Sequence, residues 1–186
     1  LHNICAGTEL SHFTAANDVV RSVHLSADSS QMAIGSDKLG KGCVCLYDAN
    51  SGTLLGEWEH PKPVWCVRLS PVGDVVAAAG YDMKMTMYDT HSLAKLHEFA
   101  YIPKAGPAFI WSMGFSEDAS HLAVGCWNGN AHLYKLHRDG EPGKGDDWLR
   151  VEEVAVAPRK DRVYAVALDK EAKHLCVGGR DKTCAL

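Results

Sequence analysis

The sequence predicts an all-β chain built from repeated four-stranded antiparallel sheets, and three observations lead to that prediction. No stretch of the 186 residues shows the apolar period of a long helix. Apolar residues instead alternate over short runs that Gly, Asp, Ser and Pro separate, which is the pattern of strands and turns. The chain also repeats itself at a spacing of about 45 residues, a length that accommodates four short strands.

The repeat is visible when the chain is aligned on itself. Four segments match, starting at Val20, Val64, Ile110 and Val163, and each has apolar residues at its first, fourth and sixth positions. A polar turn, an apolar run and a Gly-containing turn follow in every segment. The last interval is longer because residues 137–147, "HRDGEPGKGDD", form a polar, Gly-rich insertion.

The stretch "AAAGYDMKMTMYD", residues 77–89, shows how one unit continues. Gly80 and Asp82 predict a tight turn between a second and a third strand, and Tyr88-Asp89 ends the third strand. A fourth strand follows in each complete unit, as in "TLLGEWEH". The glycines that precede these turns are Gly35, Gly80, Gly125 and Gly179.

These units resemble the WD-repeat propellers. The repeat of that family has four strands in about 40–45 residues, a Gly-His pair near its start and a Trp-Asp pair at the end of its third strand. The second unit matches best, with His60, Asp82 and Tyr88-Asp89 at the corresponding places. The resemblance covers the whole chain and implies an all-β fold of propeller blades.

The chain departs from the family pattern in most units. The third-strand Trp is replaced by Tyr47, Tyr88 and Tyr134, and Asn128 replaces the turn Asp of the third unit. The His position holds Ala16, Gly106 and Arg159 outside the second unit. The resemblance therefore implies degenerate repeats held mainly by apolar stacking, whose structural residues are His60, Asp82, Tyr88, Asp89, Asp37 and Asp181.

The expected organisation is an incomplete propeller of about four blades. Residues 1–15 read as the end of a blade, residues 16–60 and 61–100 as blades, and residues 101–157 as a blade with the insertion 137–147. Residues 158–186 form an incomplete blade. Propellers of this family usually close with about seven blades, so we expect the remaining blades to come from flanking sequence of a longer protein. In the alternative, a four-bladed ring, residues 8–15 would supply the outer strand of the last blade.

The composition limits which classes of partner and which cellular compartment we expect for this chain. The net charge of −4 argues against a nucleic-acid partner for the chain as a whole, and no apolar run is long enough to span a membrane. The seven cysteines are odd in number and include no C-x-x-C pair. They are expected to be reduced thiols of a cytoplasmic protein, with the nucleus as the alternative.

Catalytic and metal-binding motifs are not found in the sequence. It contains neither G-x-S-x-G nor H-E-x-x-H, so we expect no enzyme activity, no catalytic residue, no metal and no cofactor. Cys43 and Cys45 share one face of a strand, but two thiols without further ligands do not make a zinc site, and core packing is expected there. The Gly-rich insertion lacks the Walker A pattern and is expected to be a solvated loop.

Two sets of large side chains are candidates for partner binding. Trp65, Trp111 and Tyr164 follow the first apolar position of their units, and Tyr81, Trp127 and Arg180 stand directly before a turn Asp or Asn. The resemblance implies that both sets lie on one face, around the mouth of the central channel. Aromatic residues and Arg dominate binding hot spots. The alternative is that the strand-one aromatics merely pack between blades.

The last unit adds a local basic group, Arg159, Lys160, Arg162, Arg180 and Lys182. We expect a non-catalytic scaffold that binds other proteins in a multi-protein complex. The alternative function is a module that reads a phosphopeptide, a phosphoinositide or nucleic acid through this basic group. Ordinary solvated loop charge is the simpler interpretation of the same residues.

Overall fold

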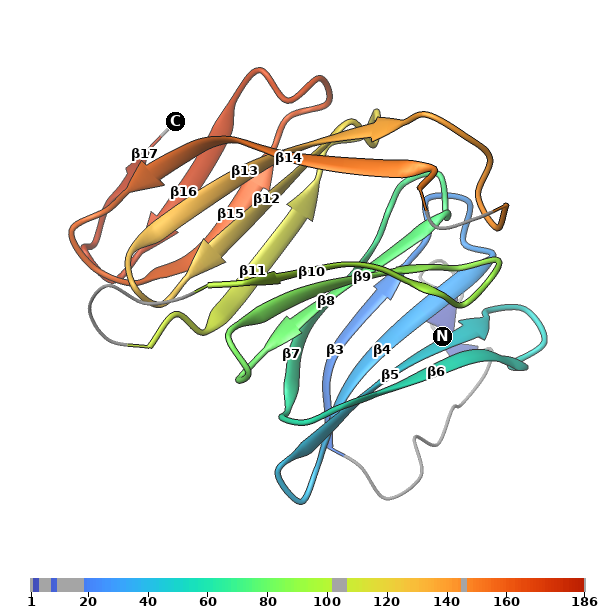
Figure 1. The fold of residues 1–186 in the computed structure, drawn as a ribbon. Helices are drawn as coiled ribbons and strands as arrows, with labels where there is room; N and C mark the ends of the chain where they lie inside the picture. Colours follow the sequence, from blue (N-terminus) through green and yellow to red (C-terminus); the bar gives the residue numbers. More distant parts are fainter. Residues whose placement is uncertain (1, 4–7, 10–18, 102–106, 145–146, 186) are drawn as a thin grey trace.

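The computed structural model of this chain describes residues 2–3, 8–9, 19–101, 107–144 and 147–185. All regular structure in those residues is β, with 17 strands and no helix, so the predicted all-β class is confirmed. Four antiparallel sheets lie next to one another in the order of the chain (Figure 1). Within the described part of the chain, nothing qualifies as a membrane-spanning helix.

The first two sheets have four strands each, in chain order across the sheet. The first sheet contains β3 (Val19–Leu25), β4 (Gln31–Lys38), β5 (Lys41–Asp48) and β6 (Leu54–His60). The second sheet contains β7 (Val64–Leu69), β8 (Val75–Gly80), β9 (Lys84–Asp89) and β10 (Lys95–Ala100).

The third sheet is also four-stranded, and the fourth has three strands in the described residues. The third sheet contains β11 (Ile110–Phe115), β12 (His121–Cys126), β13 (Asn130–Arg138) and β14 (Leu149–Pro158). The fourth sheet contains β15 (Val163–Leu168), β16 (Leu175–Gly179) and β17 (Cys184–Ala185). Because β13 runs to Arg138, the first two residues of the polar insertion belong to a strand.

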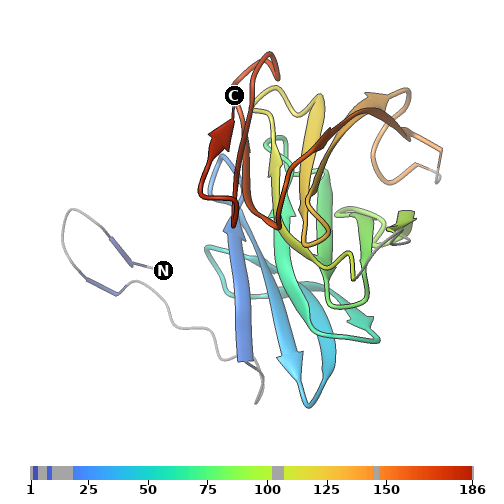
Figure 2. The same ribbon diagram turned by 90° about the vertical axis from the view of Figure 1, so that its left-hand side faces the viewer.

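The two remaining strands, β1 (His2–Asn3) and β2 (Thr8–Glu9), pair only with each other. They stand apart from the four sheets in Figure 2. In the four-bladed ring, Thr8 and Glu9 would instead lie in the sheet that contains β17. The described part of the chain shows no such pairing, and residues 10–15 lie outside it. The sheets therefore form an open, incomplete propeller.

The turn between the first and second strands has the same backbone geometry in all four units. One residue in each adopts a left-handed conformation, with φ of 61° at Ser29, 74° at Gly73, 58° at Ala119 and 53° at Ala172. Three of these residues are not glycine, so the left-handed conformation does not come from the conformational freedom of glycine. The strands on either side of the turn impose it. This shared turn is the physical basis of the sequence repeat.

Neighbouring sheets are joined along their first strands. The Val67 N–H donates to Ser22 Oγ at 3.1 Å, and the Val166 N–H donates to Ser112 Oγ at 3.2 Å, in equivalent places of two interfaces. The Leu69 N–H also donates to Nδ1 of His24 at 3.1 Å. These bonds satisfy strand-one backbone groups that no strand of the same sheet pairs with.

The turn glycines occupy two different positions rather than one. Gly35 pairs with Ser22 and Gly125 with Ser112, whereas Gly80 and Gly179 pair with Val64 and Val163, one residue further along. A Cβ on Gly35 would lie 2.9 Å from a methyl group of Val64 in the next sheet. A Cβ on Gly80 would lie 2.1 Å from the Pro63 carbonyl oxygen. Both positions therefore exclude a side chain, for different reasons.

Candidate functional site

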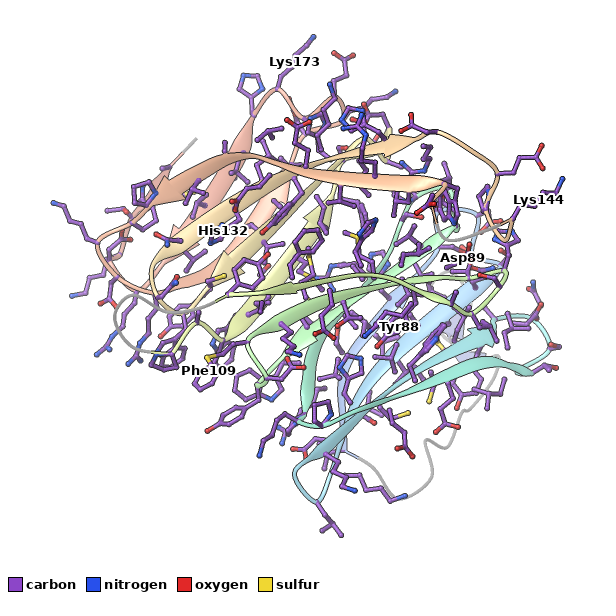
Figure 3. The ribbon with its side chains drawn as sticks, in the orientation of Figure 1. Tyr88, Asp89, Phe109, His132, Lys144 and Lys173 are labelled. Atoms are coloured by element: carbon purple, nitrogen blue, oxygen red, sulfur yellow. The ribbon has the colours of Figure 1, made fainter. Side chains whose placement is uncertain are left out.

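Six aromatic rings from three sheets and their loops lie in one continuous row, which we call the aromatic ladder. Its members occupy the starts of first strands, the residue before β11, or the turn that leaves the second strand. They are Trp65, Tyr81, Phe109, Trp111, Trp127 and Tyr164. Figure 3 labels Phe109, at the end of the molecule opposite Asp89 and Lys144.

One half of the ladder is centred on Phe109. Tyr81 stacks on Phe109 with ring centroids 4.4 Å apart and planes inclined by 16°. Trp65 meets both rings edge-on, at 5.2 Å from Tyr81 and 5.8 Å from Phe109. Its centroid also lies 4.9 Å from that of Trp111, which connects this half to the next sheet.

The other half is centred on Trp127. Trp111 stacks on it at 5.4 Å and 21°, and Tyr164 meets both indoles at about 6 Å. The guanidinium carbon of Arg162 lies 3.6 Å from the Trp127 ring centroid, a close cation–π contact. Each ring is thus held by at least two others or by a cation.

The ladder remains open to solvent despite these contacts. Tyr81, Trp111 and Tyr164 are 44%, 40% and 42% exposed. A hollow of about 620 Å³ beside the ladder is lined by Trp65, Tyr81 and Trp111 together with the charged residues Arg21, Asp37 and Lys62. Large aromatic surfaces that are both ordered and exposed are uncommon on a protein surface and mark sites of interaction.

The structure brings together five of the aromatic residues that the sequence singled out and adds Phe109, which sequence analysis missed. Phe109 directly precedes the first strand of its unit, where the second unit has Pro63. The signal in the sequence that could have identified Phe109 is an aromatic residue one position before the first strand of a unit. Trp65 and Trp111 contact each other across two units, and Trp111 is also 40% exposed.

The basic residues of the last unit have three different environments. Arg159 is mostly buried, and its Nη2 lies 3.1 Å from Asp181 Oδ2 and also bonds Thr183. Arg180 Nε lies 3.9 Å from Asp161. Lys160 and Lys182 are exposed. Only Arg162 is part of the ladder.

The residues expected to be structural in the second unit do form a network. His60 Nε2 and Tyr88 Oη lie 2.8 Å apart, and His60 Nδ1 lies 3.8 Å from Asp82. Trp58 stacks on the Tyr88 ring at 4.6 Å. Burial of the Tyr88 hydroxyl raises its pKa to about 12, so this group stays a neutral hydrogen-bonding partner.

The third unit makes the equivalent contact with different residues. Tyr101 donates its hydroxyl hydrogen to Tyr134 Oη at 2.7 Å, and both side chains are buried. Tyr101 therefore stands where His60 stands in the preceding unit, whereas the sequence alignment placed Gly106 there. Gly106 lies outside the described residues. In the last unit Arg159, bonded to Asp181, has the corresponding place.

The turn residues Asp82, Asn128 and Asp181 act alike. In each case the side-chain Oδ1 accepts the backbone N–H two residues later, at 3.1, 3.0 and 3.1 Å. Asn128 keeps the hydrogen bond that an aspartate would make, so its departure from the family pattern changes charge but not geometry. Asp37 differs: it accepts from Arg21 Nη2 at 2.7 Å, and this bond lowers its pKa.

Asp89 ties the second sheet to the insertion of the third unit. Its carboxylate is fully buried and accepts the Gly143 N–H and the Trp148 indole N–H, each at 2.7 Å. Burial alone would raise the pKa of Asp89, but bonds from the backbone N–H groups of Ser92, His91 and Gly143 and from Trp148 hold it below its ordinary value. The insertion, expected to be a solvated loop, is thus docked at Gly143; Figure 3 shows Asp89 and Lys144 on the same side.

A second polar latch lies beside it. Arg138, at the end of β13, donates from Nε to Asp74 Oδ2 at 2.6 Å and from Nη2 to Oδ1 at 3.1 Å. Its Nη1 donates to the Ala119 carbonyl at 2.7 Å. The Asp74 side chain is only 6% exposed, so this bidentate pair is largely desolvated and connects the second and third sheets.

Another hollow, of about 810 Å³, lies between β10 and the third sheet. Its polar groups bond one another: His132 Nδ1 lies 2.5 Å from Glu153 Oε1, and Tyr101 bonds Tyr134. His132 is labelled in Figure 3. In the described residues, one group of three metal-ligating side chains lies close together, Cys43, Cys45 and Glu57, on the first sheet.

The arrangement of antiparallel sheets joined along their first strands defines a set of β-propeller blades. A solved structure described as "Structure of Dos1 propeller" superposes on the whole chain with a TM-score of 0.74, at 13% identity, and the chain covers 44% of it. At that identity the similarity concerns the fold alone.

The family model "WD domain, G-beta repeat" matches residues 52–89 and 101–135. Curated relatives include "Autophagy-related protein 18" of Candida glabrata, 30% identical over 59% of this chain, and "Antiviral protein SKI8" of Saccharomyces cerevisiae, 26% identical over 41%. "Telomerase protein component 1" of Mus musculus is 29% identical over 50%. The chain spans only 22%, 23% and 3% of these relatives. Residues 52–89 and 101–135 thus match WD repeats, and the four sheets are arranged as blades of an open propeller.

Proposed function

We propose that this chain is a non-catalytic interaction scaffold whose aromatic ladder docks a segment of a partner protein, within a multi-protein complex. The observation that carries the proposal is the ladder itself: six rings fixed against one another, with Tyr81, Trp111 and Tyr164 each 40% exposed or more. The similarity to WD-repeat relatives supports it.

Preorganisation is the physical reason why such a row would bind. Rings already held at centroid distances of 4.4–6.3 Å lose little conformational freedom when a partner covers them. Aromatic residues and Arg also contribute most of the energy in typical interfaces. The ladder thus offers a large apolar contact area with a small ordering cost.

The charges beside the ladder suggest what the partner segment carries. Arg21 and Lys62 line the hollow next to Trp65, and Arg162 lies on Trp127. Asp37 is the acidic residue in that hollow, and it is already bonded to Arg21. An apolar or aromatic anchor with acidic residues beside it complements this face.

The alternative of a phosphate-reading module has less support. Two of the five basic residues of the last unit face carboxylates, Arg159 at Asp181 and Arg180 at Asp161, and Arg162 lies on an indole. A phosphate ligand would compete with those carboxylates. Steep weakening of binding with rising ionic strength would favour the alternative, because phosphate contacts depend strongly on salt.

Proteins retained from a cell extract by the wild-type protein, by Trp111→Ala and by Val72→Ala test the proposal. Val72 is 63% exposed and lies in the turn between β7 and β8, at the other end of the strands, so it is a matched apolar control. We expect a set of proteins that binds the wild type and Val72→Ala but binds Trp111→Ala about fivefold or more weakly, which corresponds to about 1 kcal/mol.

Thermal melting of the three proteins accompanies the binding comparison. Trp111→Ala loses ring contacts worth about 1–2 kcal/mol, so it should melt lower than Val72→Ala yet remain folded. Retention of the same proteins by all three variants would show that the ladder is not the docking face.

A further inference from the structure

A buried thiol, Cys43, and a partly buried one, Cys45, lie together on the first sheet. On β5, Val44 and Leu46 point into the apolar cluster shared with the second sheet. Because side chains alternate along a strand, Cys43 and Cys45 lie together on the opposite face. Their sulfur atoms are 3.6 Å apart.

A carboxylate from the next strand completes the group. Glu57 of β6 is the direct cross-strand partner of Cys45, so the two side chains share that face. Glu57 Oε1 lies 3.2 Å from Cys43 Sγ, and the two sulfurs and a Glu57 oxygen all lie within 4.8 Å of one another. The three groups belong to neighbouring positions of a paired hairpin, so the sheet itself fixes their spacing.

This spacing matches the geometry of a tetrahedral thiolate site. With metal–sulfur bonds of ~2.3 Å and a metal–oxygen bond of ~2.1 Å, tetrahedral angles place two sulfurs ~3.8 Å apart and a sulfur and an oxygen ~3.6 Å apart. The observed separations of 3.6 Å and 3.2 Å differ from these by a few tenths of an ångström.

We propose that Cys43, Cys45 and Glu57 bind a thiophilic divalent cation, with Zn²⁺ the metal that the ligand set fits best. Two thiolates select Zn²⁺ over Mg²⁺ and Ca²⁺, and Glu57 supplies the oxygen ligand that Cys43 and Cys45 alone lack. A water molecule takes the fourth position. Binding replaces two S–H bonds by two metal–sulfur bonds and releases two protons to solvent.

Ordinary thiols are protonated at neutral pH. The metal must therefore displace protons, and its affinity should rise with pH. A disulfide between the same atoms would require their 3.6 Å separation to shrink to ~2.05 Å, a far larger change.

Titration of the reduced protein with Co²⁺ tests the site, because tetrahedral thiolate-bound Co²⁺ absorbs in the visible and gives a sulfur-to-metal charge-transfer band. We expect saturation at one equivalent, release of two protons per metal, and displacement of Co²⁺ by Zn²⁺. Absence of the charge-transfer band in protein whose thiols are shown to be reduced would overturn the proposal.

Four variants locate the metal, with circular dichroism to show that each is folded. Cys45→Ser should remove the charge-transfer band, and Glu57→Gln should weaken binding by at least about tenfold. The matched controls are Cys184→Ser, an exposed thiol on the fourth sheet, and Glu59→Gln, a carboxylate two residues along β6. Both controls should bind Co²⁺ like the wild type. Unchanged binding by Cys45→Ser or Glu57→Gln, or an equal loss in a control, would contradict the assigned ligands.

Discussion

The interface between the second and third sheets is held by a different set of contacts from the one between the third and fourth sheets. The former has the largest buried cluster of the described residues and two polar latches, Asp74–Arg138 and Asp89–Trp148. The latter has a smaller cluster around Val163 and Val166, the hydrogen bond to Ser112, and the ring contacts of Tyr164 and Arg162 with the third unit. Equivalent repeats thus give unequal interfaces.

The difference arises from residues outside the repeat pattern. Arg138 ends an extended β13 inside the insertion 137–147, and Trp148 directly follows that insertion, so the insertion bears on both contacts. In repeat arrays the stability is close to a sum of unit and interface contributions. The insertion therefore adds stability at one interface, whatever else it does.

The largest expected effect comes from breaking the buried ion pair. Arg138→Met leaves Asp74 as a nearly buried carboxylate without its cation, and we expect a loss of about 2–3 kcal/mol in the free energy of unfolding, reduced from the fully buried case because the Arg138 side chain is 24% exposed. The control is Arg21→Met, which removes a 2.7 Å pair with Asp37 from an exposed site and should cost about 0–1 kcal/mol. Urea unfolding measures both. Equal losses would show that burial does not distinguish the two pairs.

The next effect compares one repeat position in two sheets. Val67 is fully buried between the first and second sheets, whereas Val23, at the same position of β3, is 50% exposed. Val67→Ala should cost about 2 kcal/mol, from lost methyl burial and the cavity left behind. Val23→Ala should stay within about 0.5 kcal/mol. A large loss at Val23 in the same unfolding experiment would mean that its face is covered.

A smaller effect is expected from the second latch. Trp148→Phe keeps a ring but removes the indole N–H from buried Asp89, which still accepts from Gly143, so we expect a loss of about 1–2 kcal/mol. Trp58→Phe is the control, because its indole N–H donates to the Leu93 carbonyl at a solvent-accessible place. Trp58→Phe should lose less free energy of unfolding than Trp148→Phe. A lower urea midpoint for Trp58→Phe than for Trp148→Phe would show that the bond between Trp148 and Asp89 does not stabilise this interface.

The smallest effect concerns pH at the interface between the first and second sheets. His24 Nδ1 accepts the Leu69 N–H, which requires a neutral ring, and burial and then Arg68 lower its pKa from 6.5. The unfolded chain therefore binds the proton more readily, so this stabilisation is complete above pH 6.5 and is lost as the pH falls through the lower folded-state pKa.

His24→Asn keeps a side-chain acceptor but does not titrate. Between about pH 7.5 and about pH 5.5 its urea midpoint should fall less than that of the wild type, and the difference isolates His24 from other histidines. Parallel curves for the two proteins would show that His24 does not sense pH.

Much of the fold follows from the sequence because strand and turn patterns are local. The alternation in "VWCVRL" and the turn at Asp82 depend on near neighbours, and both reappear in the structure. Contacts between units join residues far apart in the sequence and are harder to predict in this way. In the third unit Tyr101 makes the contact that His60 makes in the second unit, although the sequence alignment does not place these two residues at the same position.

The candidate site shows the same limit. The sequence singled out Tyr81 and Trp127 as large side chains at exposed tips. The stacking of Tyr81 on Phe109 depends on how the second and third sheets are displaced, whereas Trp127 stacks on Trp111 within the third unit. The third ligand beside Cys43 and Cys45 depends on the register of β5 and β6, which brings in Glu57 from the next strand. Composition and periodicity encode neither the displacement between sheets nor the register between strands.

The close spacing of the three indoles in the aromatic ladder has an optical consequence. Trp65, Trp111 and Trp127 follow one another at centroid distances of 4.9 and 5.4 Å, so their electronic transitions couple instead of absorbing independently. Coupled, rigidly oriented chromophores give intense near-ultraviolet circular dichroism, a signal that disappears when fixed packing is lost. The protein thus carries an intrinsic, label-free reporter at the face where a partner would dock, and any ligand that turns one ring changes the spectrum of all three.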